Sequence, residues 1–146
     1  MGGVTLGQEI QVVAFKIGSG EYGVDILEVQ EIIKVLSITR VPRADRFIEG
    51  VINLRGNVIP VFNLHKRFGV SSELDGEARI VVFQFEETKA GIIVDGVSEV
   101  LRIEGDAIEE ADKVYHGLEA DFIQGVGKIE GRLLILLNMR KLLGIN

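Results

Sequence analysis

The chain has 146 residues, of which 47% are hydrophobic, with a net charge of −6 and no cysteine. This length suits one ordinary domain or two very small ones, and the apolar content is enough for a packed core. The lack of cysteine excludes disulfides, thiol catalysis and cysteine-ligated zinc, and the negative charge argues against nucleic acid as a main partner. With only His65 and His116, a multi-histidine metal site within one chain is also excluded.

The start of the chain, MGGVTLGQEI, has no basic region followed by an apolar one, so we do not expect a signal peptide. The longest apolar runs, such as 133–137, are far shorter than the roughly 20 residues that span a bilayer. We therefore expect a cytoplasmic protein with no direct membrane insertion, in which residues 1–8 form a loose tail.

The apolar pattern predicts that most of the chain is strand. Apolar residues alternate over 13–17 and again over 24–26, on either side of a glycine-rich turn at 18–20, which predicts a β-hairpin. The next strand is expected over 29–35, where β-branched residues are frequent. A second hairpin is expected over 50–64.

Helices are expected to be few and short. Asn63 and Asn138 can each cap a helix that ends before a glycine six residues later. Residues 42–47, which begin with a proline, are compatible with one helical turn. The acidic stretch 104–121 is expected to be an exposed loop with a helical turn.

The chain is one structural unit written twice. Residues 11–35 align without gaps on 79–103, and residues 47–69 align on 122–144 with eight identities in 23 positions. Each copy offers about five short strands separated by turn signals, which predicts small barrels. Because so few strands make a poor core alone, we expect two lobes packed together with a groove at their junction.

Glycines 18, 20 and 23 spell G-x-G-x-x-G, the pattern of a dinucleotide site. Such a site needs a helix after the glycines, so that phosphate can lie at the helix N-terminus. Here the following residues alternate as a strand, which favours a plain hairpin turn. A small-ligand or nucleotide-binding β protein that uses the Gly18–Gly23 turn is the alternative function.

Other polar residues give no catalytic pattern. Asp25 and Asp95 are expected on the solvent face of strands. The carboxylates of 106–112 are expected in a solvated loop that could bind a cation only weakly. His65 and His116 have no nucleophile or carboxylate at a diagnostic spacing. We therefore expect that the protein is not an enzyme and that it has neither a cofactor nor a metal site.

The matched turns of the two copies differ in charge. Copy one has Arg55 where copy two has Glu130. A turn arginine is often only surface, but arginine is also suited to bidentate pairing and to interface hot spots. Glu31 and Glu99 recur at matched positions in apolar strands, either as charges that guard a strand edge or in an interface salt bridge.

Three segments together resemble the CheW family of bacterial chemotaxis coupling proteins. They are EYGVDILEVQEI at 21–32, FIEGVINLRGNVIPVFNL at 47–64 and GIIVDGVSEVL at 91–101. They occur in the family's order and approximate spacing, and the similarity covers residues 8–145. The combination is specific, whereas the NLRG turn alone would not be.

The resemblance implies an all-β fold of two pseudo-duplicated, SH3-like lobes, each a five-stranded β-barrel, packed together with minor short helices. Residues 9–146 would form a single domain. Lobe one would lie mainly in 9–70 and lobe two mainly in 78–146, or the two would be interleaved.

The resemblance further implies a non-enzymatic adaptor that couples methyl-accepting chemotaxis receptors to the histidine kinase CheA. Its partners would be the regulatory domain of the kinase, which shares this fold, and the cytoplasmic tips of the receptors. The free protein is expected to be a cytoplasmic monomer that is recruited to membrane-associated receptor–kinase arrays and helps to assemble them.

The resemblance also divides the surface into two sets of residues. The receptor-facing set consists of Val29, Arg55, Val97 and Val100. Its valines would line an apolar groove between the lobes. The kinase-facing set, on an edge of the first lobe, consists of Glu31, Ile33, Glu49 and Gly50. Relatives carry lysine in place of Glu49, so the partner kinase would need a compensating charge.

Overall fold

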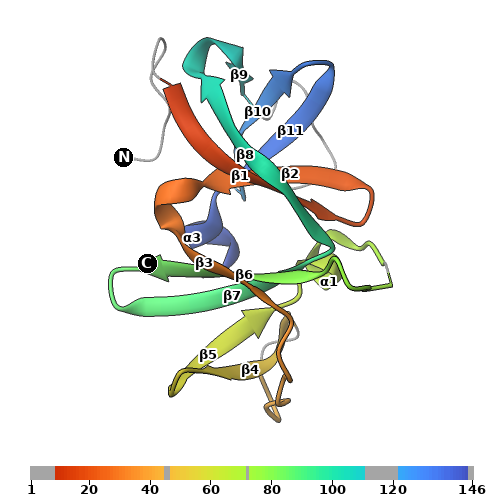
Figure 1. The fold of residues 1–146 in the computed structure, drawn as a ribbon, viewed down its shortest axis with the longest axis vertical. Coiled ribbons are helices and arrows are strands. Elements are labelled where there is room, and N and C mark those ends of the chain that lie inside the picture. The colour runs from red at the N-terminus through yellow and green to blue at the C-terminus, as the bar shows by residue number, and fades with distance from the viewer. Residues whose placement is uncertain (1–8, 45–46, 72, 111–121, 145–146) are drawn as a thin grey trace.

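The structure, a computed structural model, describes residues 9–44, 47–71, 73–110 and 122–144, and these form two stacked β-sheets (Figure 1). The six-stranded sheet has the order β8-β1-β2-β11-β10-β9 and the five-stranded sheet the order β3-β6-β7-β5-β4. The strands of the first are β1 (Glu9–Ile17), β2 (Gly20–Asp25), β8 (Gly96–Glu104), β9 (Ile108–Glu109), β10 (Ile123–Ile129) and β11 (Arg132–Leu137). Those of the second are β3 (Val29–Lys34), β4 (Ile48–Leu54), β5 (Asn57–Phe62), β6 (Arg79–Phe85) and β7 (Thr88–Val94).

Each sheet combines strands from both halves of the chain. The β1–β2 hairpin joins β8 to β11, while the matching β6–β7 hairpin joins β3, β4 and β5. In each sheet, one strand of the hairpin that comes from the other half of the chain pairs in parallel with its neighbour. These parallel pairs are β2 with β11 and β7 with β5. The predicted all-β class is therefore confirmed. The short strand β9 gives one lobe six strands where five were expected.

The matched hairpins β4–β5 and β10–β11 close with the same tight turn. Leu54 pairs with Asn57, which leaves a two-residue loop of Arg55 and Gly56. Both loop residues have positive φ, 50° and 88°, and the Glu130–Gly131 loop repeats this with 48° and 79°. Positive φ at both central residues is the type I′ geometry that suits the twist of a hairpin. The turn therefore projects a charged side chain at the same place in each lobe.

A second pair of matched glycines lets a connecting segment lie against the edge of each lobe. Thr39 forms an isolated antiparallel bridge with Val51 of β4, through hydrogen bonds of 2.9 and 2.8 Å. A Cβ atom on the neighbouring Gly50 would lie 2.3 Å from the carbonyl oxygen of Thr39. In the other lobe β9 lies on β10 in the same way, and a Cβ on Gly125 would lie 2.5 Å from Ile108. Both edges are therefore partly covered by the chain itself.

The predicted asparagine caps are confirmed. Asn63 caps α1 (Leu64–Phe68) by accepting a hydrogen bond of 3.3 Å from the N–H of Lys66, and Gly69 ends the helix at φ 70°. Asn138 caps α3 (Met139–Leu142) in the same manner. In Figure 1 the two short helices lie on opposite sides of the junction between the sheets.

Some local expectations need correction. Ile26 does not extend the hairpin strand but begins the 3₁₀ turn η1 (Ile26–Glu28), because the side chain of Asp25 accepts the N–H of Leu27 at 2.9 Å. The helical turn expected in the acidic stretch after β8 is confirmed by η2 (Gly105–Ala107), but the same stretch also contains the short strand β9, which was not expected. Residues 42–44 form a turn without helix, and 45–46 and 111–121 lie outside the described residues.

Apolar side chains form three clusters. One lies within the five-stranded lobe around Ile52, Ile59 and Ile80, and one within the six-stranded lobe around Ile103 and Leu134. The largest lies between the lobes and takes residues from both sheets and both helices, including Phe15, Phe83, Leu64 and Leu142. Because apolar burial is worth about 25 cal/mol per Å², this shared cluster is the main reason that the lobes stay together.

We expect Gly50→Ala to lower the free energy of unfolding by about 1–3 kcal/mol, because the added Cβ meets the backbone of Thr39 and forces it away. Urea denaturation measures the effect. Gly76→Ala is the matched control, since a Cβ there meets nothing within 4 Å, and it should change stability by less than about 0.5 kcal/mol. Equal stability of the two variants would contradict the proposed close approach.

Candidate protein-binding site

The predicted receptor-facing valines lie where the chain passes between the sheets. It crosses once at 25–29, into the start of β3, and once at 94–96, into the start of β8, so Val29 ends the first crossing and Val97 follows the second. Both are half-buried and pack against the shared core. Val100, further along β8, is 51% exposed. Val100 is therefore the member of this set that offers free apolar surface.

Arg55 and Glu31 form an ion pair between the β4–β5 turn and β3. The arginine side chain is 66% exposed and the glutamate 26%. The sequence had placed these two residues in different partner-facing sets. The structure brings them into direct contact, a contact that spacing along the chain does not indicate.

The other lobe contains a related arrangement at Glu99, the counterpart of Glu31. Its partner is Arg132, at 3.0 Å, which also binds Glu21 through two hydrogen bonds of 3.0 and 2.7 Å. These hydrogen bonds hold the pKa of Glu21 below its ordinary value. In both lobes the matched glutamate is thus paired with an arginine of the matched hairpin, from the turn in one and from β11 in the other.

Glu49 is compensated by its own chain. It accepts a hydrogen bond of 3.1 Å from the amide of Asn63, and Lys66 and Arg40 lie 3.3 and 3.6 Å away. The hydrogen bond from Asn63 is the main cause that lowers the pKa of Glu49, and Lys66 and Arg40 add to it. Glu49 thus has cationic partners within the chain, and the compensating charge on a partner kinase stays a prediction.

The other two residues of the kinase-facing set are packed. Ile33 is half-buried and lies against the core of the five-stranded lobe, and Gly50 is buried beneath Thr39. A substitution at either position would change the lobe itself. The polar groups of the set come from Glu31 on β3 and Glu49 on β4, the two end strands of the five-stranded sheet, so the set is divided between both ends of this sheet.

The two aspartates expected on solvent faces have other positions. Asp25 caps η1, and Asp95 lies in the second crossing with its side chain only 18% exposed. Oδ2 of Asp95 lies 3.0 Å from Nε2 of the buried His65 and accepts the N–H of Gly18 at 2.5 Å. The only sign of this contact in the sequence was a single aspartate, Asp95, between two predicted strands. His116 lies outside the described residues.

A cation–π sandwich on α1 was also missed. The guanidinium of Arg67 lies 4.7 Å from the ring centroid of Phe47 and 4.5 Å from that of Phe122. These two phenylalanines are matched positions of the duplication, one before β4 and one before β10. Arg67 therefore contacts the residues that precede equivalent strands, β4 and β10, in the two lobes.

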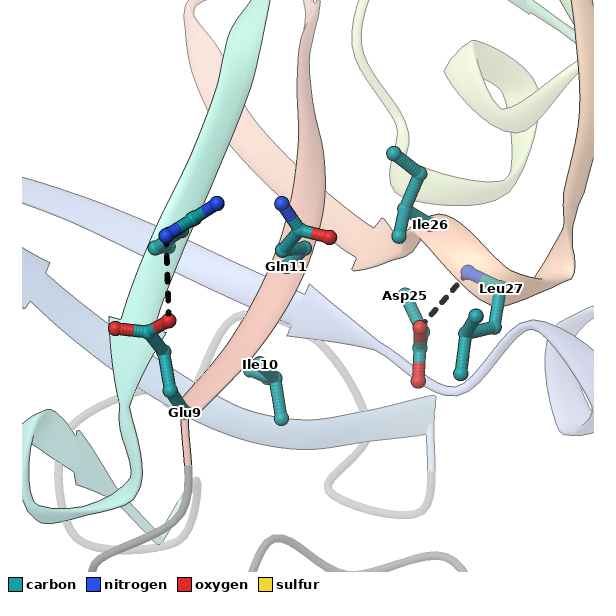
Figure 2. Close-up of a pocket in the computed structure, with 7 residues that line it drawn as sticks. Glu9, Ile10, Gln11, Asp25, Ile26 and Leu27 are labelled. Carbon is teal, nitrogen blue, oxygen red and sulfur yellow. Dashed lines mark hydrogen bonds and ion pairs between the residues drawn. The ribbon is translucent and has the colours of Figure 1, made fainter.

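A hollow of about 390 Å³ lies beside the first crossing (Figure 2). Glu9 stands on one side and Leu27 on the other. The carboxylate of Glu9 lies 3.9 Å from the guanidinium of Arg102, which also lines the hollow. Leu27 is 88% exposed, and Ile10 and Ile26 add apolar surface. The hollow has apolar walls with charged groups at its border, which is typical of a contact surface rather than of reacting groups.

The Gly18–Gly23 segment is a hairpin turn followed by β2, as the strand pattern predicted. The N–H of Gly18 is occupied by Asp95. Within the described ranges, no three acidic, histidine or cysteine side chains are grouped to hold a metal ion. Of the acidic stretch, Glu109 pairs with Lys128 at 3.1 Å, and Asp112 lies outside the described residues.

Two interleaved all-β lobes around a shared core define a scaffold with sheet edges and exposed side chains for contact. A family model for the CheW-like domain matches residues 11–145. The chain belongs to the CheW family, and its role is that of a chemotaxis adaptor.

The relatives are similar over nearly their whole length. A chemotaxis protein CheW of Klebsiella aerogenes is 39% identical over 98% of this chain and 86% of its own. One of Treponema pallidum is 34% identical over 92% and 82%. The crystal structure of the scaffolding protein TtCheW from Thermoanaerobacter tengcongensis superposes with a TM-score of 0.83 at 37% identity, covering 90% of this chain and 86% of that one. This likeness confirms the predicted two-lobed, SH3-like fold.

None of the helices in the described part of the chain is long and apolar enough to cross a bilayer.

We expect Glu49→Gln to reduce the acid sensitivity of the protein. A lowered folded-state pKa means that Glu49 stabilises the fold above its unfolded-state pKa, about 4.3, and that this contribution disappears as the pH falls through the folded-state pKa. The stability difference between wild type and Glu49→Gln should therefore shrink as the pH is lowered. Urea denaturation at several pH values measures it. Glu87→Gln, in an exposed turn, is the control, and an equal effect there would contradict the assignment.

Proposed function

We propose that this chain is a cytoplasmic adaptor that couples methyl-accepting chemotaxis receptors to the histidine kinase CheA and is recruited to membrane-associated receptor arrays. Membership of the CheW family and the scaffolding fold support this proposal. The receptor tip contacts the set Val29, Arg55, Val97 and Val100. The regulatory domain of the kinase contacts the set Glu31, Ile33, Glu49 and Gly50.

The chemistry of the two sets suits this division. Val100 provides exposed apolar area, while Val29 and Val97 are half-buried against the shared core, and apolar area provides affinity. Charged side chains at the border of an interface mainly set orientation and partner choice. Ile33 and Gly50 act indirectly, because they shape the strands from which the two glutamates project.

The observation that carries the proposal is the ion pair between Arg55 and Glu31, one residue from each set. An exposed ion pair is worth only about 0.2–1 kcal/mol, so a partner can exchange it at low cost. A receptor that engages Arg55 releases Glu31 and thereby alters the kinase-facing edge. By linkage, a kinase that binds Glu31 must equally alter the affinity for the receptor.

Titration calorimetry with the regulatory domain of the cognate kinase tests the proposal directly. Saturable one-to-one binding is the expected result. An absence of binding at kinase-domain concentrations of tens of micromolar would contradict the coupling role. Such a result would mean a binding free energy of roughly −6 kcal/mol or weaker.

We expect Arg55→Glu to weaken binding to a receptor-tip fragment at least tenfold, because it removes a candidate hot-spot arginine and places two carboxylates together. The charge exchange Glu31→Arg with Arg55→Glu restores the internal pair and should recover folding stability but not receptor affinity. Glu130→Lys, at the matched turn of the other lobe, is the control and should bind as wild type. Co-sedimentation with receptor assemblies measures the affinity, and an unchanged value for Arg55→Glu would refute the assignment.

We expect Val100→Glu to abolish most receptor binding while leaving the melting temperature almost unchanged, since this side chain is half-exposed before any partner binds. Val58→Glu is the matched control, because Val58 is a 68% exposed valine on β5, outside the receptor-facing set. Equal loss of receptor binding in both variants would argue for a general surface effect and against a groove at Val100.

A further inference from the structure

The two crossings between the lobes are equivalent by duplication but are held differently. In the alignment of the two copies, His65 corresponds to Arg140, Asp95 to Leu27 and Gly18 to Glu86. Each crossing thus lies beside a short helix of one lobe and a hairpin turn of the other. The side chains at these three matched places decide how firmly each crossing is fixed.

The crossing at 94–96 is tied to both lobes by Asp95. Its Oδ2 accepts the N–H of Gly18, in the β1–β2 turn of the six-stranded lobe, at 2.5 Å. The same oxygen lies 3.0 Å from Nε2 of His65, on α1 of the five-stranded lobe. Its own N–H donates to the carbonyl of Lys16 at 2.8 Å. The His65 and Asp95 side chains are only 10% and 18% exposed, so water competes weakly for these bonds.

Arg67 strengthens the same side of the junction. It stacks between Phe47 and Phe122, which lead into equivalent strands of opposite lobes. Its counterpart in the duplication is Leu142, a buried residue of the shared core. On the other side of the junction the described contact of this kind is a single one, between Arg140 and the ring of Phe85 at 4.9 Å, in place of a sandwich between two rings.

The crossing at 25–29 has weaker side-chain connections. Leu27, in the place of Asp95, is 88% exposed. Arg140, in the place of His65, reaches Glu86 at 3.7 Å, with the two side chains 39% and 83% exposed, and its guanidinium lies 4.9 Å from the ring centroid of Phe85. Ion pairs as exposed as this one contribute little to stability.

We propose that the His65–Asp95 contact is a latch that fixes the angle between the two lobes. The shared core holds the lobes together, but apolar attraction is non-directional, whereas the bonds at Asp95 have a defined geometry. When the latch is lost, the lobes move about the remaining contacts, and the change concentrates at the 94–96 crossing. Val97 follows this crossing and Val29 ends the other, so the lobe angle sets their separation. Only this consequence for the groove rests on the proposed function.

Double electron–electron resonance, which measures the distance between two nitroxide labels, tests the latch. The native chain has no cysteine, so Asn57→Cys on β5 and Glu104→Cys on β8 label one exposed position in each lobe specifically. We expect His65→Phe and Asp95→Asn each to shift or broaden the distance distribution, and the double variant to add little. Glu86→Gln, at the matched exposed pair, is the control and should leave the distribution unchanged. Unchanged distributions in both latch variants, or equal broadening in the control, would overturn the proposal.

Hydrogen exchange provides a second test that includes the native chain. The latch requires the Gly18 amide of the wild type to exchange more slowly than that of Ser19 in the same turn, and to exchange on the order of tenfold faster in His65→Phe. A Gly18 amide as labile as Ser19 in the wild type would overturn the proposal even if the variants fail to fold. Neither readout uses a receptor or kinase, so a failure of the latch is distinct from a failure of the adaptor role.

Discussion

The apolar core shared by the two sheets is the constraint on which the rest of the structure depends. Phe15 from the six-stranded sheet and Phe83 from the five-stranded sheet are both fully buried in it. The clusters inside the single lobes are smaller, and a small lobe buries a lower share of its surface than the two lobes bury together. Packing of the lobes against each other therefore adds most to the buried apolar surface.

The exchange of hairpins gives this packing its form. Because β1–β2 joins the strands of the second half and β6–β7 joins those of the first, the chain must cross between the sheets twice. Val29 and Val97, two of the three valines proposed for receptor contact, lie at these crossings. A change in the angle between the lobes would thus alter the separation of Val29 and Val97 through very few residues, and for the proposed adaptor this is a physical route by which one partner can influence the other.

The duplicated scaffold is kept, while its charges have diverged. Arg55 and Glu130 stand on turns of the same geometry, and only Arg55 pairs with the matched glutamate of its lobe. His65 and Arg140 occupy the same place on the two short helices, one buried beside Asp95 and one half-exposed beside Glu86. Equivalent backbones with different side-chain partners allow each face of the molecule to have its own contacts.

The sequence by itself determined what depends on near neighbours. The strands, the glycine turns and the caps at Asn63 and Asn138 could be predicted because each arises within a few residues. The sequence likewise predicted the duplication and the family. Only the tertiary structure decided which distant side chains meet, such as Arg55 with Glu31 and Asp95 with His65. These contacts depend on the way the hairpins are exchanged and stacked, and a local pattern contains no information on that geometry.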